Sequence, residues 1–159
     1  MKPRLLITRK VFDETIALLQ PHFDIEANQD DAVRDAVELR RRVHDKQALF
    51  VTASDTIDAG IIDAAPGLRI IATGSVGYNQ IDIARCRERG IAVTNTPDVL
   101  TESTADMAWA LLMAAARRVT ESERWLRDGH WQRWAFDQFL GHDVHGETLG
   151  IVGMGRIGS

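Results

Sequence analysis

The sequence is poor in the features that mark secreted and membrane proteins. Its single cysteine, Cys86, cannot form a disulfide within the chain, so we expect a reducing compartment. The N-terminal segment MKPRLLITRK has only three consecutive apolar residues, too few for a signal peptide or a membrane span. We therefore expect a cytoplasmic protein with no membrane partner.

Basic runs and metal-ligand clusters are scarce as well. The net charge is −4, and the densest basic group, Arg40 to Arg42, closes a predicted helix, where cations are favourable. We therefore expect no nucleic-acid partner. His142 and His145 stand in a glycine-flanked loop without a third ligand, which favours a solvated loop over a metal site. No Ser-His-Asp or Cys-His arrangement can be argued.

What the sequence does contain is an alternation of short apolar runs and helical patterns. The predicted strands are residues 5–7, 23–27, 48–51, 68–72 and 91–93. The predicted helices are residues 11–19, 32–43, 57–64 and 81–89, the last closed by Gly90. Strands and helices alternating at this spacing indicate crossover connections and a parallel sheet. The predicted fold class is α/β, with a flavodoxin-like parallel sheet in residues 1–99.

The helix predicted over residues 32–43 is amphipathic. One stripe of it carries Val33, Ala36, Val37 and Arg40.

The pattern changes after Pro97. Residues 105–116 are apolar nearly all round, which predicts a helix buried on every side, between domains or between subunits. Thr101 or Ser103 is the expected cap of this helix. We place a domain boundary near residues 97–102, so that residues 100–159 begin a second, Rossmann-type domain.

Two glycine-rich turns follow predicted strands, where open parallel sheets bind their ligands. The turn over residues 73–79 exposes backbone N–H groups, which fits either an anion-binding nest or a tight strand-to-helix turn. Residues 149–153 read as a strand that leads into Gly153-x-Gly155-x-x-Gly158. This pattern holds a dinucleotide pyrophosphate in many proteins, and the alternative is a glycine-rich tail without a ligand.

Four longer motifs support the first alternative at both turns. They are GSVGYNQID, ERGIAVTNTPDVLTESTADMAWALLMAAARR, DGHWQRW and HGETLGIVGMGRIG. With them, residues 74–158 resemble the D-isomer-specific 2-hydroxyacid dehydrogenases, in wording most similar to the glyoxylate/hydroxypyruvate and 2-ketogluconate reductases. The resemblance implies reduction of glyoxylate, hydroxypyruvate or 2-ketogluconate to a D-2-hydroxy acid with NADH or NADPH, by a homodimer.

The resemblance also implies roles for individual residues. Val76 and Gly77 would bind the substrate carboxylate through their N–H groups, and Ala53 and Ser54 would line the substrate side of the cleft. Trp134 would reach into the pocket of the neighbouring subunit. The residues that would bind the cofactor are Thr104, at its nicotinamide end, and Gly153, Gly155, Arg156, Ile157 and Gly158, at its pyrophosphate.

The catalytic arginine, carboxylate and histidine of the family follow the glycine motif, so no catalytic residue is assigned within this chain. We expect the chain to be the N-terminal half of such an enzyme and to be inactive alone. NAD and NADP are not distinguished, because the discriminating residue lies about 20 positions beyond the motif. Two alternatives remain: a non-catalytic NAD(H)-binding relative acting as a sensor or co-repressor, and a stand-alone flavodoxin-like binding module.

Overall fold

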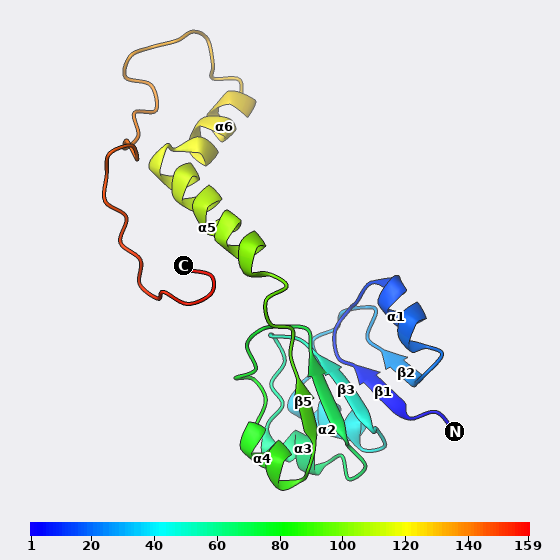
Figure 1. The fold of residues 1–159 in the computed structure, drawn as a ribbon. Coiled ribbons are helices and arrows are strands. Elements are labelled where there is room, and N and C mark those ends of the chain that lie inside the picture. The colour runs from blue at the N-terminus through cyan, green and yellow to red at the C-terminus, as the bar shows by residue number, and fades with distance from the viewer. The chain divides into compact units, whose positions relative to one another are not determined.

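The computed structural model describes all residues from Met1 to Ser159 (Figure 1). The chain divides into two compact units, Met1–Pro97 and Asp98–Ser159. None of its helices is long and apolar enough to cross a membrane.

The first unit is built on a five-stranded parallel sheet in the order β2-β1-β3-β4-β5. The strands are β1 (Arg4–Ile7), β2 (Asp24–Ala27), β3 (Ala48–Val51), β4 (Ile70–Thr73) and β5 (Ala92–Thr94). The helices are α1 (Asp13–Leu19), α2 (Ala36–Val43), α3 (Ala59–Asp63) and α4 (Ile83–Glu88). This is the flavodoxin-like strand order, and the predicted α/β class is confirmed.

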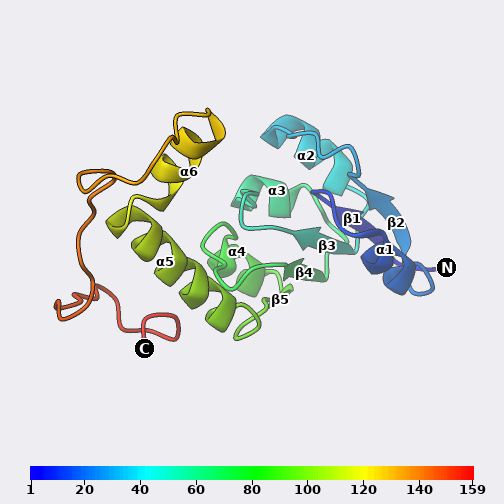
Figure 2. The ribbon, with the colours of Figure 1, turned by 90° about the horizontal axis from the view of Figure 1, so that it is seen from above.

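Neighbouring residues of a strand point to opposite faces of the sheet, and helices cover both faces. Leu6 belongs to the larger core cluster, with side chains of α2, α3 and α4, among them Cys86. Leu5 and Ile7 belong to the smaller cluster, which packs against α1 through residues such as Ile16. Figure 2 shows α1 on the opposite side of the sheet from α2 and α3.

Aspartates begin three of these helices. The side chains of Asp35, Asp58 and Asp82 each accept a hydrogen bond from a backbone N–H in the first turn, at 2.8, 2.8 and 2.9 Å. Each bond satisfies a donor that the helix leaves unpaired. At the other end of α4, Gly90 has φ +67°, so the predicted glycine C-cap is confirmed.

The stripe that the sequence indicates on this amphipathic helix is not the buried face of α2. Val33 and Val37 are 86% and 73% exposed, and the buried residues of the helix are Leu39 and Val43. The helix starts after Asp35, so Val33 lies outside it, and the sheet selects the Leu39–Val43 pair four residues apart.

An ion cluster joins β2 to α2 and to the segment before β3. Lys46 is almost fully buried, and its Nζ lies 2.9 Å from Glu26 Oε2. Arg42 also donates to Glu26. Burial alone would raise the pKa of Glu26, but the hydrogen bonds from Lys46 and Arg42 outweigh burial and lower it. The carboxylate therefore stabilises the unit in its ionised form.

We expect Glu26→Gln to lower the melting temperature at pH 7, because it removes one of the two carboxylates, Glu26 and Asp45, that pair with the buried Lys46 ammonium. A lowered pKa gives stability that is present above the ordinary carboxyl pKa and is lost as the pH falls through the folded value. The difference from wild type should therefore shrink between about pH 5 and pH 3.

Thermal melts across this range check the expectation. Asp24→Asn is the control, since Asp24 lies on the same strand, is exposed and approaches Arg4 only at 3.8 Å. A difference between Glu26→Gln and wild type that does not change with pH would contradict the assignment.

The second unit contains α5 (Thr101–Ala116) and α6 (Val119–Arg127), joined by Arg117 and by Arg118, which is in the left-handed region. The helix α6 was not predicted. The expected caps of α5 are wrong: the N-cap position is Leu100, which makes no side-chain bond, and Thr101 is already helical. No residue of α5 is buried within the chain, and Trp109 and Leu111 are 52% and 63% exposed.

The strand predicted over residues 149–153 does not form. These residues are irregular, and the second unit has no other strand with which they pair. An extended segment without a neighbour leaves its backbone groups unpaired, so the apolar pattern alone does not make it a strand.

Candidate functional site

The turns that follow the strands of the first unit meet at the carboxyl edge of the sheet. They come after β1 (residues 8–9), β3 (52–55), β4 (74–80) and β5 (95–96). The strand order reverses between β1 and β3, and ligands of open α/β sheets bind beside such a reversal. A cavity of about 250 Å³ opens there, lined by residues that include Thr8, Arg9, Ser54 and Asp55.

The turn after β4 has the properties of an anion-binding nest. The N–H groups of Val76 and Gly77 donate to no other group of the chain. A Cβ added to Gly77 would meet no atom within 4 Å, so the turn is open there. On the opposite side, Asn95 Nδ2 donates to the Val76 carbonyl at 2.8 Å and the Thr96 N–H donates to the Ser75 carbonyl at 3.0 Å. The turn therefore has free donors and a fixed backbone.

The turn after β3 is held by charge. Asp55 Oδ2 accepts from the Thr52 N–H at 2.7 Å and from Thr8 Oγ1 at 2.7 Å. Arg9 Nη1 donates to Ser54 Oγ at 2.9 Å, so the two predicted substrate-side residues, Ala53 and Ser54, lie on a fixed loop. Gln80 Nε2 lies 3.4 Å from the Thr52 carbonyl oxygen and so links this loop to the nest.

Arg9 is itself held by Asp31, which follows β2. Arg9 Nε and Nη2 donate to the two carboxylate oxygens of Asp31 at 2.8 and 2.9 Å. The hydrogen bond from Arg9 is the main reason that the pKa of Asp31 lies well below its ordinary range, and the same contact raises the pKa of Arg9. The guanidinium stays charged and oriented beside Ser54 at any physiological pH.

The glycine-rich turn of the second unit has a distinctive backbone conformation. Gly153 has φ +101°, a conformation that side chains disfavour. A Cβ on Gly158 would come 2.2 Å from the Gly153 carbonyl oxygen, whereas one on Gly155 would meet nothing within 4 Å. The Ser159 N–H donates to the Gly155 carbonyl at 3.0 Å, which closes one helical turn. Close packing at Gly158 and open space at Gly155 match the roles of these glycines in a dinucleotide site.

The other predicted cofactor residues lie in the same unit. Arg156 Nη1 is 3.2 Å from Asp98 Oδ1, and both side chains are 67% exposed. Such a surface pair contributes about 0–1 kcal/mol, so an anionic ligand can replace Asp98 at little cost. Ile157 lines a hollow against α5, and Thr104 is exposed in the first turn of that helix.

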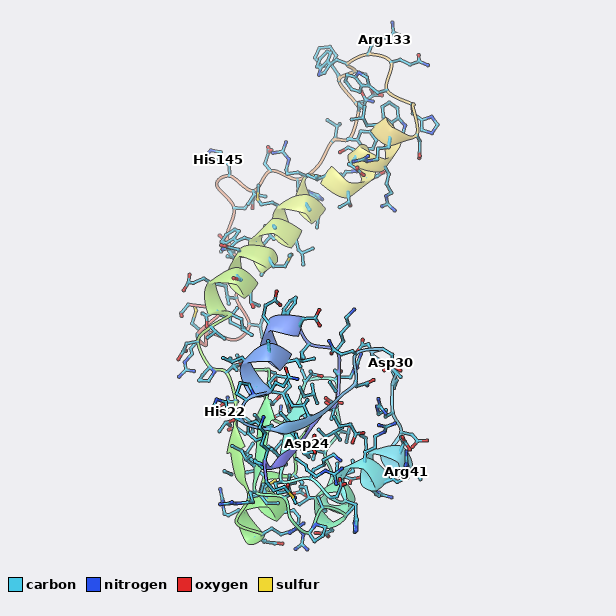
Figure 3. The ribbon with its side chains drawn as sticks, turned by 90° about the vertical axis from the view of Figure 1, so that its right-hand side faces the viewer. His22, Asp24, Asp30, Arg41, Arg133 and His145 are labelled. Atoms are coloured by element: carbon cyan, nitrogen blue, oxygen red, sulfur yellow. The ribbon has the colours of Figure 1, made fainter.

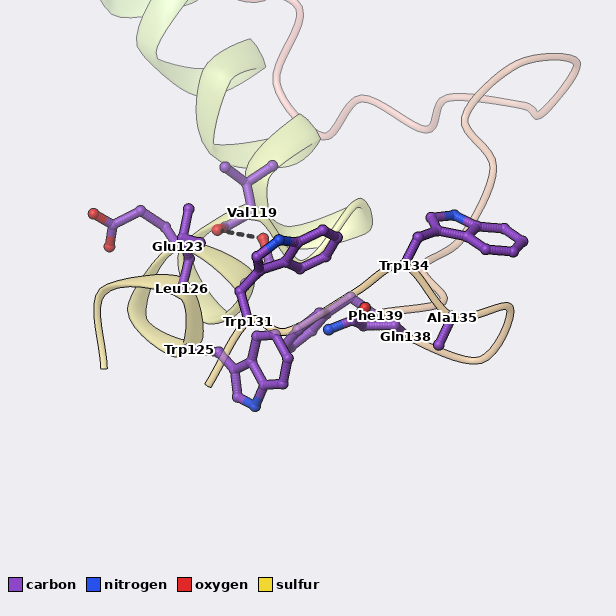
Figure 4. Close-up of a pocket in the computed structure, with 10 residues that line it drawn as sticks. Val119, Glu123, Trp125, Leu126, Trp131, Trp134, Ala135, Gln138 and Phe139 are labelled. Atoms are coloured by element: carbon purple, nitrogen blue, oxygen red, sulfur yellow. Dashed lines mark hydrogen bonds between the residues drawn. The ribbon is translucent and has the colours of Figure 1, made fainter. Parts of the chain in front are cut away.

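Trp134 lies beyond α6, in an irregular segment rich in aromatic side chains. It packs on Phe136 at 4.3 Å between ring centroids and is 64% exposed. Trp125, Trp131 and Phe139 form a separate cluster, with Trp125 making edge contacts to both other rings (Figure 4). Trp134 stands apart from this cluster at the rim of a pocket of about 610 Å³.

Histidines and carboxylates form no metal centre. No group of three or more potential ligands gathers in the chain. His145 lies on an irregular segment of the second unit, and His22 lies between α1 and β2, as Figure 3 shows. Neither belongs to the turns that build the nest.

Sequence reasoning did not find several residues that hold the site. Arg9 and Asp31 are 22 positions apart, and Asn95 and Val76 are 19 apart. The available signal was position alone, because each of these residues follows shortly after a predicted strand.

Comparison with known proteins gives consistent results. The family model described as D-isomer specific 2-hydroxyacid dehydrogenase, catalytic domain, matches residues 5–140. A glyoxylate reductase of Thermococcus onnurineus is 48% identical over 162 residues, which cover 99% of this chain and 48% of the relative. The chain thus spans about half the length of the curated relatives it matches.

Solved structures agree with the sequence relatives. A putative D-isomer specific 2-hydroxyacid dehydrogenase from Polaromonas superposes with a TM-score of 0.91 at 42% identity, covering 99% of this chain and 50% of the other. An NADPH-dependent glyoxylate/hydroxypyruvate reductase from Sinorhizobium meliloti, in complex with NADP and malonate, gives a TM-score of 0.80 at 35% identity, covering 99% and 48%.

Proposed function

Because the chain belongs to the D-isomer specific 2-hydroxyacid dehydrogenase family, we propose that the protein containing it reduces small 2-oxo acids to D-2-hydroxy acids with NADH or NADPH. The observation that carries this proposal is the pair of free N–H groups at Val76 and Gly77, at the carboxyl edge of the sheet. Glyoxylate and hydroxypyruvate are the favoured substrates, because relatives and a solved structure bear those names.

The residues of this chain have defined tasks in that reaction. The N–H groups of Val76 and Gly77 bind the substrate carboxylate, and Ala53 and Ser54 border the substrate. Gly153, Gly155 and Gly158, with Arg156 and Ile157, bind the pyrophosphate, and Thr104 faces the nicotinamide end. A bound nicotinamide supplies the hydride. The carbonyl oxygen of the substrate then needs a proton donor within hydrogen-bond reach. The turns that form the nest contain no histidine that could provide it.

The two units are proposed to have different roles. We propose that the first unit, residues 1–99 in the sequence prediction, is the substrate domain and that residues 100–159 begin the dinucleotide-binding domain. The catalytic arginine, carboxylate and histidine are proposed to lie outside residues 1–159. The free and buried Cys86 fits a reducing compartment, and the cytoplasm is the proposed location.

Turnover is the direct test. The purified full-length protein should oxidise NADH or NADPH, followed by nicotinamide absorbance, when glyoxylate, hydroxypyruvate or 2-ketogluconate is added. Nucleotide binding without turnover of any of the three would favour the sensor or co-repressor alternative. A cooperatively folding fragment of residues 1–99 that binds a ligand without the rest would favour the stand-alone module.

We also propose that the protein is a homodimer that uses α5. Met107, Trp109, Leu111 and Met113 are all 41% exposed or more, and apolar surface on this scale marks interfaces. A two-fold dimer would bring Trp134 to the neighbouring subunit's pocket. Light scattering of the full-length protein at micromolar concentration should give twice the chain mass, and a monomer would refute this assembly.

A further inference from the structure

A chain of buried polar groups lies directly beneath the nest. Thr73 and Ser75 are 2% and 9% exposed, and their hydroxyl oxygens are 2.7 Å apart. Ser75 Oγ donates to the Gly77 carbonyl at 2.6 Å, and Gln80 Nε2 donates to Thr73 Oγ1 at 3.1 Å. These contacts link the Gln80 side chain to the backbone of the nest.

The direction of donation along these hydrogen bonds follows from the number of hydrogens that each group carries. A hydroxyl group has one proton to donate, and Ser75 gives its proton to the Gly77 carbonyl. The proton between Thr73 and Ser75 must then come from Thr73, and Thr73 in turn accepts from Gln80. The order of donation is Gln80, Thr73, Ser75, Gly77. In such a chain each bond polarises the next.

Each fixed carbonyl also fixes the N–H that follows it. The chain has no cis peptide bond, so the C=O of one residue and the N–H of the next point in opposite directions. Thr96 holds the Ser75 carbonyl, which orients the N–H of Val76. Asn95 holds the Val76 carbonyl, which orients the N–H of Gly77.

The same rule applies one residue further along. Ser75 holds the Gly77 carbonyl inward, so the Tyr78 N–H points away from the buried chain. Like those of Val76 and Gly77, this N–H donates to no group of the protein. The turn therefore presents three successive N–H groups, those of Val76, Gly77 and Tyr78. The carbonyl that precedes each of them is held by a hydrogen bond.

We propose that the Tyr78 N–H is a third donor to the ligand carboxylate, and that Ser75 is a positioning residue that holds this donor through the Gly77 carbonyl. The proposal rests on the proposed role of the nest as the carboxylate site. Ser75 does not touch the ligand. It acts by preventing rotation of the Gly77–Tyr78 peptide group, which would turn a carbonyl oxygen toward an anion.

Three variants of the full-length protein test this. Ser75→Ala removes the hydroxyl that makes the shorter hydrogen bond to the Gly77 carbonyl, at 2.6 Å, and leaves only Gln80 Nε2, which lies 3.4 Å from that oxygen. Thr73→Val keeps the shape of residue 73 but removes the donor to Ser75, and Thr73→Ser keeps that donor as the matched control. The measurements are calorimetric binding of oxalate with NADH present, KM and kcat for glyoxylate, KM for NADH, and melting temperature.

Ser75→Ala should weaken oxalate binding about tenfold and raise KM for glyoxylate to a similar degree, as expected for one charge-assisted hydrogen bond. Thr73→Val should give a smaller change in the same direction, and Thr73→Ser should match wild type. The KM for NADH should stay constant in all three. A general loss of folding would instead move the KM for NADH and the melting temperature as well.

Two results would overturn the proposal: oxalate affinity of Ser75→Ala equal to that of wild type, or no oxalate binding by the wild type. A third result would contradict the proposed reductase activity and leave the role of Ser75 standing. If the wild type binds oxalate, Ser75→Ala weakens that binding, and no 2-oxo acid is reduced, the nest assignment stands and the proposed activity is wrong.

Discussion

Gly155→Val in the full-length protein is expected to weaken the binding of NADH and NADPH by more than about tenfold, or roughly 1.4 kcal/mol. A Cβ at Gly155 would meet no atom of the chain within 4 Å, so a valine side chain enters the open space in front of the turn. That space is the one proposed for the pyrophosphate. Because nothing in the protein is displaced, the melting temperature without nucleotide should not change.

The matched variant is Gly158→Ala, three residues further along. Its Cβ would lie 2.2 Å from the Gly153 carbonyl oxygen, so the turn has to open. We expect Gly158→Ala to lose nucleotide affinity and also to lower the melting temperature. Calorimetry and thermal melts of both variants separate the two effects. If Gly155→Val changed the affinity less than tenfold, the cofactor assignment of this turn would be wrong.

The second large effect is expected at the nest. Gly77→Pro should reduce kcat/KM for glyoxylate at least about tenfold, because the proline ring replaces the N–H that is proposed to bind the substrate carboxylate. The Gly77 N–H is free of any partner in the chain, so its loss breaks no hydrogen bond of the folded protein. The affinity for NADH should be retained.

Gly77→Ala is the control for this experiment, since it keeps the N–H and its Cβ would meet no atom within 4 Å. Steady-state kinetics should show a much smaller loss for alanine than for proline. Equal losses would mean that bulk at position 77 matters and the N–H does not.

The sheet was predictable because its strands are short apolar runs bounded by turn residues. Leu5 to Ile7 and Ala48 to Val51 are apolar on both faces, as strands buried between two layers must be. The choice of buried face on α2 was not predictable in the same way. Val37 and the Leu39–Val43 pair are all apolar, and only the position of the neighbouring sheet decides which of them is buried.

The residues of the site also differ in whether the sequence predicts them. The glycines at 77, 153, 155 and 158 could be proposed from the sequence because the backbone conformation and space they allow leave a local pattern. The residues that hold the turns were not found, because Arg9 meets Asp31 only when β1 pairs with β2. The segment 149–153 shows the converse, since its strand pattern is clear but a strand needs a neighbour.

The single cysteine gives the first unit a built-in reporter of its own opening. Cys86 is 1% exposed in the larger core cluster, and burial raises the pKa of its thiol, so the folded protein should react very slowly with thiol reagents. Labelling requires α4 to separate from the sheet. The labelling rate of this thiol therefore measures how often the edge formed by α4 and β5 opens. Since Asn95 follows β5 directly and holds the Val76 carbonyl, the same rate reports how durable the nest is.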